Sequence, residues 1–364
     1  MNKIKVNLDK RSSHSYEIYI GYDILDRIAL LIAKSALAAN YIIIADTTVS
    51  SLYGETVLSA LRETGLTVDM IDFPPGEASK TIDTALSLIE QLVDRGVDRS
   101  SCLIALGGGV TGDMVGFIAS IYMRSIPYIQ MPTTLLAQVD SSIGGKTGID
   151  IFKGKNLVGT FCQPKAVYID LKFLDTLPDV EFTNGLAEIV KYGIIDDPDL
   201  LATIESEISN IRKRNIDNLG VIVAQSCKIK KSIVEIDERD MGVRRILNFG
   251  HTIGHAIESA SGYTISHGNA VSIGMMASAR ISEKMKYLSM EDREHMENLI
   301  QKVGLLNYIP SSIQTDDIMS RMKHDKKKEG HTVHFVLLKK IGVPFINGSV
   351  ADNIIEDTIG ELRQ

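Results

Sequence analysis

Residues 101–113 read SCLIALGGGVTGD. The first six form a short apolar run typical of a buried strand, and this run continues directly into three glycines, Gly107 to Gly109. Glycines between a strand and a helix let the backbone approach a ligand, and the unpaired N–H groups at the helix N-terminus suit a phosphate. The stretch therefore predicts an α/β domain with a candidate nucleotide-binding loop.

Strand-like runs and amphipathic helical stretches alternate on both sides of this loop. The sequence predicts a hairpin over 6–20, strands at 41–45, 67–73, 101–106 and 127–131, and helices over 47–64, 80–95 and from Thr133 onward. Such alternation is typical of an open, mostly parallel sheet with helices on both faces. We therefore expect a Rossmann-like nucleotide-binding domain.

The pattern changes near Leu177 and Pro178. Helical stretches then follow one another at 179–195, 199–214, 216–236, 248–262, 267–287 and 291–303, with one β-like run at 331–338. We predict an α/β domain over 1–177 and a mainly helical domain over 178–364. Ligands of such proteins bind at the carboxyl ends of strands and in clefts between domains, so the site residues are expected to converge there.

Composition limits the partners and the compartment. Of 364 residues, 39 are Lys or Arg and 46 are Asp or Glu, which gives a net charge of −7. This bulk charge repels nucleic acid and anionic membranes, so an anionic ligand requires a local basic pocket. The three cysteines lie far apart without CxxC spacing, and no apolar stretch is long enough for a signal segment or a membrane span. We expect a soluble, cytoplasmic protein.

The glycine loop matches the pattern GxGxxG by letter, but this match alone is weak. It comes well after the first strand–helix unit, and no acid ends the next strand, over 126–132; Asp46, at the end of an earlier strand, could contact a ribose instead. A tight turn without a ligand is the alternative. Gly144, Gly145 and Lys146 partly match a P-loop, but the GxxxxGK spacing is absent, which disfavours a nucleoside triphosphatase.

Three of the eight histidines lie close together in the second half of the chain. His251 and His255 are four residues apart and so share a helix face, and His267 follows. No carboxylate lies between the first two, so this is not a metalloprotease HExxH motif. A catalytic zinc takes three protein ligands, commonly with a carboxylate, and Glu188 is a candidate third ligand. The alternatives are hydrogen-bonded core histidines and a plain helix ion pair of Glu188 with Lys191.

Several segments together resemble the 3-dehydroquinate synthase family of the sugar phosphate cyclase superfamily. The matching segments are 75–80 (PGEASK), 107–113 (GGGVTGD), 131–146 (MPTTLLAQVDSSIGGK), 155–159 (KNLVG), 184–191 (NGLAEIVK), 247–256 (LNFGHTIGHA), 266–268 (SHG) and 325–327 (DKK). They run in the family's order over nearly the whole chain, and the segment 131–146 is highly specific. The resemblance implies a nucleotide-binding domain, a helical metal-binding domain and an active site between them.

The resemblance also implies a role for individual residues. The metal ligands would be Glu188, His251 and His267, so that His255 would face substrate. The NAD-binding residues would be Asp46, Glu77, Lys80, Gly108, Gly109, Val110, Thr111, Gly112, Asp113, Thr133, Thr134, Lys146 and Lys155. The residues around the substrate's phosphate, carboxylate and hydroxyls would be Arg124, Asp140, Lys146, Asn156, Lys191, Lys230, Arg244, Asn248, His255 and Lys326.

Three positions depart from the family pattern. Ser125 follows Arg124 where glycine is usual, Asp240 stands where glutamate is usual, and Asn269 stands where glutamate is common. None of the three removes a proposed ligand.

The activity that the resemblance implies is a phosphate-eliminating carbon–oxygen lyase of the shikimate pathway. It would convert 3-deoxy-D-arabino-heptulosonate 7-phosphate to 3-dehydroquinate with catalytic NAD and Zn²⁺ or Co²⁺, as a homodimer. The alternatives are another cyclase, such as a 2-deoxy-scyllo-inosose or valiolone-type synthase, a metal-dependent polyol dehydrogenase, or a non-catalytic regulator that binds NAD and metal.

Overall fold

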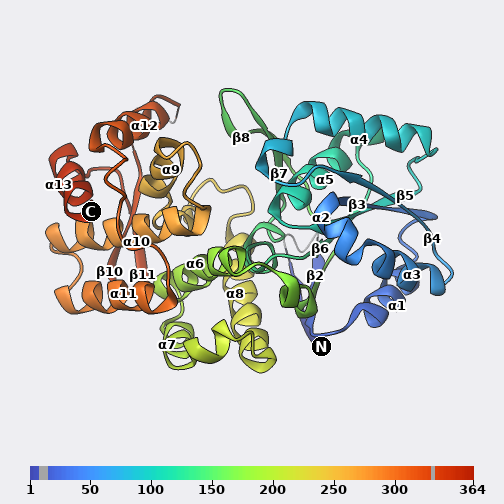
Figure 1. Ribbon diagram of the computed structural model, residues 1–364, viewed down its shortest axis with the longest axis horizontal. Helices are drawn as coiled ribbons and strands as arrows, with labels where there is room; N and C mark the ends of the chain where they lie inside the picture. Colours follow the sequence, from blue (N-terminus) through green and yellow to red (C-terminus); the bar gives the residue numbers. More distant parts are fainter. Residues whose placement is uncertain (8–14, 329–332) are drawn as a thin grey trace. The chain divides into compact units, whose positions relative to one another are not determined.

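The computed structural model describes residues 1–7, 15–328 and 333–364, and for 323–328 it describes the backbone alone. The chain forms two compact units (Figure 1). The first comprises Met1–Leu177 with Leu219–Arg239, and the second comprises Pro178–Asn218 with Asp240–Gln364. Most of helix α8 (Ile216–Ile236) therefore packs within the first unit, although the predicted division places it in the second.

A largely parallel sheet forms the first unit. Its strands are β1 (Asn2–Val6), β2 (Tyr16–Gly21), β3 (Asn40–Asp46), β4 (Thr67–Phe73), β5 (Ser101–Gly107), β6 (Tyr128–Pro132) and β9 (Ala166–Asp170). In the described part of the chain they lie in the order β1-β2-β9-β6-β5-β3-β4, with β1 and β2 antiparallel and the other neighbours parallel. The predicted α/β fold is confirmed.

Helices cover both faces of this sheet because its central strands are apolar on both sides. The longer helices are α1 (Leu25–Ser35), α3 (Glu55–Glu63), α4 (Ile82–Asp94) and α5 (Gly109–Ile121). Ile42 and Ile44 of β3 pack in a core with α4 and α5, whereas Tyr41 and Ile43 pack in a second core with α1 and α3. Alternate side chains of one strand thus enter opposite cores.

Shorter turns complete the first unit. They are α2 (Thr47–Val49), the 3₁₀ segments η2 (Glu77–Ser79), η3 (Tyr122–Arg124) and η5 (Leu171–Thr176), and the π-helical segments η1 (Ser50–Gly54) and η4 (Ala137–Ser141). The helix predicted from Thr133 is therefore brief, since its regular part ends in η4.

An antiparallel hairpin of β7 (Lys146–Ile151) and β8 (Gly154–Phe161) was not predicted. Glycine and polar residues obscure the alternation of apolar and polar side chains that would mark its strands. The glycines are needed for the pairing of the two strands. Gly148 and Gly159 lie opposite each other, and a Cβ on Gly159 would approach the Thr147 carbonyl oxygen to 2.1 Å. The two strands can pair this closely only without side chains at these positions.

Three successive residues after α5 have left-handed backbone conformations. The φ angles of Met123, Arg124 and Ser125 are 50°, 68° and 92°. Ser125, with ψ of 120°, lies in a region that only glycine enters without strain. The structure thus explains why glycine is usual in the family at this position.

We expect Ser125→Gly to raise the free energy of unfolding by about 1 kcal/mol, because it removes this strain. Urea denaturation followed by circular dichroism measures the change. Ser206→Gly, at an exposed position inside α7 (Pro198–Arg212), is the matched control and should lower stability by about 0.5 kcal/mol. Equal destabilisation by both variants would contradict the strain at Ser125.

The second unit is mainly helical, as predicted. Its helices are α6 (Asp179–Ile195), α7, α9 (His251–Ala260), α10 (His267–Lys284), α11 (Met290–Val303), α12 (Thr315–Lys328) and α13 (Asp352–Leu362), with the 3₁₀ segment η6 (Val243–Asn248) and the antiparallel pair β10 (Phe335–Lys340) and β11 (Val343–Asn347). Helix α10 is buried and packs against α6, α9, α11 and α13. The predicted run 331–338 begins as a strand at Phe335, and residues 331–332 lie outside the described residues.

Helices α12 and α13 were not predicted. In α12 the hydrophobic side chains are few, and Ile318, Met319 and Met322 form a narrow buried stripe among charged residues. Such a helix depends on tertiary packing of that stripe.

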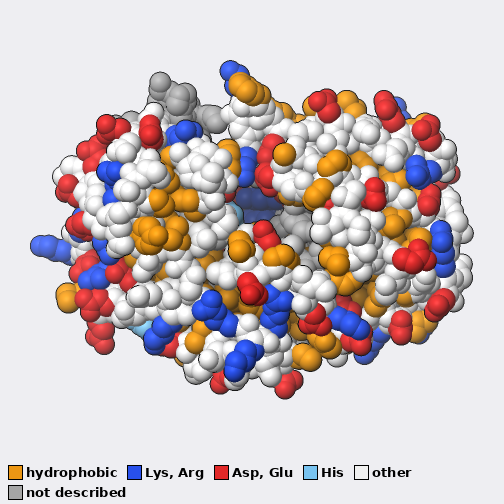
Figure 2. Space-filling view, viewed as in Figure 1, with side chains coloured by type: hydrophobic (Ala, Val, Ile, Leu, Met, Phe, Trp, Pro, Cys, Tyr) orange, Lys and Arg blue, Asp and Glu red, His pale blue; other side chains and the backbone are white. Residues whose placement is uncertain are grey.

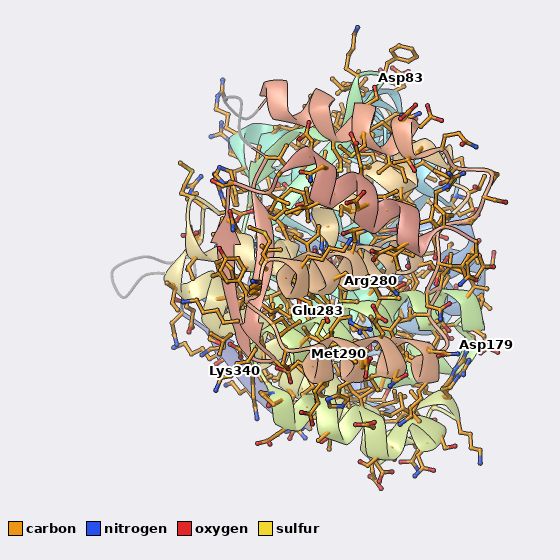
Figure 3. The ribbon with its side chains drawn as sticks, turned by 90° about the vertical axis from the view of Figure 1, so that its left-hand side faces the viewer. Asp83, Asp179, Arg280, Glu283, Met290 and Lys340 are labelled. Atoms are coloured by element: carbon orange, nitrogen blue, oxygen red, sulfur yellow. The ribbon has the colours of Figure 1, made fainter. Side chains whose placement is uncertain are left out.

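Ion pairs join the surfaces of α10 and α11. Figure 3 shows Arg280 and Glu283 of α10, and Met290 at the start of α11, on the side of the second unit that faces the viewer. Arg280 Nε donates to Glu297 at 2.7 Å, and Arg293 Nε donates to Glu283 at 2.8 Å. Figure 2 shows charged side chains of both signs on the visible face of both units.

No helix among the described residues is both long and apolar enough to cross a bilayer. The thiols of Cys102, Cys162 and Cys227 are free, and the first and last are buried.

Candidate functional site

Three helices of the second unit bring a carboxylate and two imidazoles together. Glu188 lies in the middle of α6, whereas His251 and His267 are the first residues of α9 and α10. The Nε2 atoms of both histidines lie 3.5 Å from the same atom, Glu188 Oε1. The structure thus assembles Glu188, His251 and His267 into a candidate metal centre.

Glycines allow the three helices to meet. A Cβ on Gly274 of α10 would lie 1.8 Å from the Gly250 carbonyl oxygen, and one on Gly254 of α9 would lie 3.0 Å from the Ala270 carbonyl oxygen. At the start of α10, the N–H of Gly268 donates to Asn184 Oδ1 of α6. These close approaches set His251 and His267 against Glu188.

The outer nitrogen of each imidazole has its own partner. His251 Nδ1 lies 3.1 Å from the Phe249 carbonyl oxygen, and His267 Nδ1 lies 3.2 Å from Glu258 Oε2. A carbonyl and a carboxylate only accept hydrogen bonds, so each Nδ1 is the donor. Both Nε2 atoms are therefore left to act as ligands.

The donor set fits a zinc-type ion. Zinc bonds of about 2.0–2.1 Å in a tetrahedron place neighbouring ligand atoms about 3.4 Å apart, and the two measured Nε2 to Oε1 distances are 3.5 Å. Three protein ligands leave a fourth position for a substrate oxygen. Glu188, His251 and His267 would hold such an ion.

Neighbouring charges and burial shift the pKa values of the two histidines. Glu188 is fully buried, and its Oε2 contacts the ammonium of Lys191, one turn later on α6. Burial and the nearby Lys191 charge hold the pKa of His251 well below its ordinary value. Burial also lowers the pKa of His267, but in the metal-free protein hydrogen bonds to Glu188 and Glu258 outweigh it and raise this pKa to about 10, so Nε2 would release its proton when a metal binds.

His255 lies beside the centre rather than in it. Its ring centroid is 5.2 Å from that of His251 and 6.0 Å from that of His267. It forms a second group of candidate ligands with Glu258 and His267. Glu258 was not singled out from the sequence, although its position seven residues after His251 puts it on the same face of α9.

The glycine loop of the first unit is built partly by packing. A Cβ on Gly107 would lie 2.4 Å from Thr111 Oγ1, and one on Gly112 would lie 2.7 Å from Gln130 Oε1. The N-cap residue of α5, Gly108, offers no side chain to the N–H groups of the first turn. Those N–H groups suit a diphosphate, so the loop fits a dinucleotide.

A buried lysine ties the loop to the hairpin. Lys80 Nζ lies 2.6 Å from Asp113 Oδ2 of α5 and 2.6 Å from Asn156 Oδ1 of β8. Burial lowers the pKa of Lys80, but the Asp113 carboxylate more than compensates and raises it. Asn156 has a left-handed backbone, with φ of 54°, and its N–H donates to Asp150 Oδ1 at 2.8 Å.

Further predicted NAD residues also have structural partners. Asp46 caps α2, because its Oδ1 accepts from the N–H groups of Thr48 at 2.9 Å and Val49 at 3.0 Å. Lys155 Nζ lies 3.5 Å from Glu77 Oε1. Thr133 and Thr134 follow β6, next to the glycine loop: the Thr133 N–H donates to the Gly107 carbonyl at 2.9 Å.

The predicted substrate residues are divided between the units. In the first unit Lys230 Nζ of α8 lies 2.6 Å from Asp140 Oδ1 of η4, whereas Arg124 and Lys146 have exposed side chains. In the second unit Lys191 contacts Glu188, Arg244 is buried, and Asn248 and His255 are exposed. The side chain of Lys326 lies outside the described residues.

The departures at 240 and 269 also have local effects. Asp240 has a φ of 57°, a conformation that aspartate tolerates better than most residues. Asn269 Oδ1 accepts from the N–H of Leu306 at 2.9 Å, so this amide joins α10 to the segment after α11.

Comparisons with known proteins agree over nearly the whole chain. Family models described as 3-dehydroquinate synthase N-terminal and C-terminal match residues 70–184 and 185–328. A 3-dehydroquinate synthase of Desulforamulus reducens is 44% identical over 343 residues, 94% of this chain and 95% of the relative.

Solved structures of two cyclases are similar along the chain. A 2-deoxy-scyllo-inosose synthase complexed with carbaglucose-6-phosphate, NAD⁺ and Co²⁺ has a TM-score of 0.90 at 28% identity, covering 99% of this chain and 100% of that one. A 2-epi-5-epi-valiolone synthase of Streptomyces hygroscopicus with NAD⁺ and Zn²⁺ has a TM-score of 0.89 at 26% identity, covering 98% and 99%.

Proposed function

The chain belongs to the 3-dehydroquinate synthase family, and from that premise we propose that it converts 3-deoxy-D-arabino-heptulosonate 7-phosphate to 3-dehydroquinate and inorganic phosphate. It is a carbon–oxygen lyase of the shikimate pathway that uses NAD catalytically with Zn²⁺ or Co²⁺. The convergence of His251 and His267 on one oxygen of Glu188 carries this proposal, because it supplies a three-ligand centre with an open position.

The residues divide the work by charge. When bound, the metal supplies Lewis acidity and NAD supplies reversible hydride transfer. The glycine loop holds the dinucleotide together with Lys80 and its partner Asp113. Asp46, Glu77 and Lys155 bind the same dinucleotide. A set of cations and amides binds the substrate's anionic groups and hydroxyls. They are Arg124, Lys146, Asn156, Lys191, Lys230, Arg244, Asn248 and Lys326, with Asp140 positioning Lys230 and His255 facing substrate.

The activity is tested with the heptulosonate phosphate and NAD at a catalytic concentration. We expect phosphate release and a rise in dehydroquinate absorbance, with no accumulation of NADH. Glucose 6-phosphate, whose carba analogue binds the inosose synthase, is the competing substrate. Turnover of that sugar alone would favour another cyclase, and stoichiometric NADH would favour a dehydrogenase.

The preferred substrate follows from identity and charge. The curated relative with the 3-dehydroquinate synthase name is 44% identical, against 26% and 28% for the two other cyclases. The cations Lys230 and Arg244 also suit a substrate that carries a carboxylate besides its phosphate.

We also propose that the protein is a cytoplasmic homodimer. The free thiols support a reducing compartment. Helix α4 supports the dimer, because it buries Ala85, Leu88 and Leu92 in the core while leaving another stripe of apolar side chains at the surface. That stripe contains Ile82, Leu86 and Val93, which are 41%, 50% and 58% exposed.

We expect Leu86→Glu to dissociate the dimer, since a carboxylate in this stripe would be buried against the second copy. Light scattering after size exclusion measures the mass, which should fall from twice 40.0 kDa to 40.0 kDa. Leu30→Glu, at a leucine 51% exposed on α1, is the matched control and should remain dimeric. A dimeric Leu86→Glu protein would place the interface elsewhere, and a monomeric wild type would contradict the dimer itself.

A further inference from the structure

The imidazole of His267 lies between two carboxylates. Its Nε2 is 3.5 Å from Glu188 Oε1, and its Nδ1 is 3.2 Å from Glu258 Oε2. Glu258 is only 7% exposed. A carboxylate removed from water requires compensating hydrogen bonds, and the Nδ1–H of His267 provides one.

Helix α9 serves both candidate histidine ligands. His251, His255 and Glu258 lie four and three residues apart and so share one face of the helix. This face supplies the candidate ligand His251 and also Glu258, the carboxylate that contacts the other candidate ligand, His267. The two ligands therefore differ: Nδ1 of His251 meets a neutral carbonyl at 3.1 Å, whereas Nδ1 of His267 meets a charged carboxylate.

We propose that Glu258 is a positioning residue that holds His267 in the Nδ1–H tautomer and aims its Nε2 lone pair at the metal. This rests on the metal centre of the proposed function. A carboxylate behind a ligating imidazole fixes the ring and makes its other nitrogen a stronger donor. Glu258 touches neither metal nor substrate in this role.

The competing arrangement is a second cation site. His255, Glu258 and His267 also have ligand atoms within 4.8 Å of one another. If they held an ion while Nε2 of His267 stayed directed at Glu188, Nδ1 of His267 would be the metal ligand and could not donate to Glu258. Metal stoichiometry and the tautomer of His267 therefore separate the two arrangements.

The test is metal affinity, measured by competition with a chelator on the full chain with Zn²⁺ and with Co²⁺. We expect Glu258→Gln to weaken binding about 10- to 100-fold, and the visible spectrum of the Co²⁺ protein to shift. Glu297→Gln in α11 is the matched control: that carboxylate pairs with Arg280 and Arg293, and its loss should leave affinity and spectrum unchanged. Unchanged affinity in Glu258→Gln would overturn the proposal.

A second measurement needs no variant. Nitrogen-15 NMR of histidine-labelled wild type loaded with one equivalent of Zn²⁺ should show Nδ1 of His267 protonated and Nε2 metal-bound. A metal-bound Nδ1, or two ions per chain in a titration with excess Zn²⁺, would overturn the proposal. Metal binding that is intact in the wild type and equal in Glu258→Gln rejects this inference alone, whereas a wild type without affinity for either metal rejects the proposed function.

Discussion

Glu188→Gln is expected to lose the metal and to lower turnover by about 10³-fold or more. Both histidine Nε2 atoms converge on Glu188 Oε1, and an amide is a much weaker ligand than a carboxylate. A Lewis acid contributes several kcal/mol to stabilising the reacting oxygen, and about 1.4 kcal/mol corresponds to a factor of ten. Inductively coupled plasma mass spectrometry measures the metal content, and a phosphate-release assay measures the turnover.

The same substitution also removes the charge that neutralises Lys191. That ammonium is 2% exposed, so we expect a loss of about 3 kcal/mol of stability, and both assays belong well below the melting temperature. Glu181→Gln, at an exposed position on the same helix, is the control and should keep both metal and turnover. Full metal occupancy in Glu188→Gln would show that this carboxylate is not a ligand.

Lys80→Met is expected to destabilise the first unit by about 3–5 kcal/mol and to weaken NAD binding. The ammonium is 4% exposed, and its loss leaves Asp113, with 20% exposure, without its cation at 2.6 Å. It also frees Asn156, so the glycine loop and the β7–β8 hairpin are no longer joined at this point. Urea denaturation and NAD titration by calorimetry measure the two losses.

Two variants show whether burial causes that effect. Lys80→Met combined with Asp113→Asn should recover part of the lost stability, because the uncompensated charge is removed. Lys172→Met breaks an exposed ion pair with Asp23 at 2.8 Å and should change stability little. Equal losses in Lys80→Met and Lys172→Met would contradict the role of burial.

Periodicity predicted most of the secondary structure, and it failed where glycine or charge obscured it. The strand over 67–73 and the helices over 179–195 and 216–236 have the predicted bounds. The β7–β8 hairpin was missed because the close pairing of Gly148 and Gly159 requires small residues rather than alternating ones. Helix α12 was missed because its buried stripe is narrow.

Residue types and spacing predicted the histidines and the carboxylate of the site, whereas their grouping into one ligand set came from the family resemblance. Reasoning from the residues placed His251 and His255 on one helix face and left Glu188 with either a metal or Lys191. The structure brings Glu188 next to both Lys191 and two histidines. Glu258 carried no signal beyond its spacing on α9, since a single acid on a helix is usually solvated.

The sequence by itself determined the α/β alternation of the first unit and the helical character of the second, the glycine loop between β5 and α5, and the inventory of histidines, carboxylates and cations. The family resemblance implied His267 as the second histidine ligand, but residue spacing alone left the choice open, and only the tertiary structure shows the contact that brings His267 rather than His255 next to Glu188. Spacing along α9 favours His255, since it shares a face with His251. The close approach of α9 and α10 at Gly250 and Gly274 brings His267 there instead, and no local pattern encodes a contact between helices.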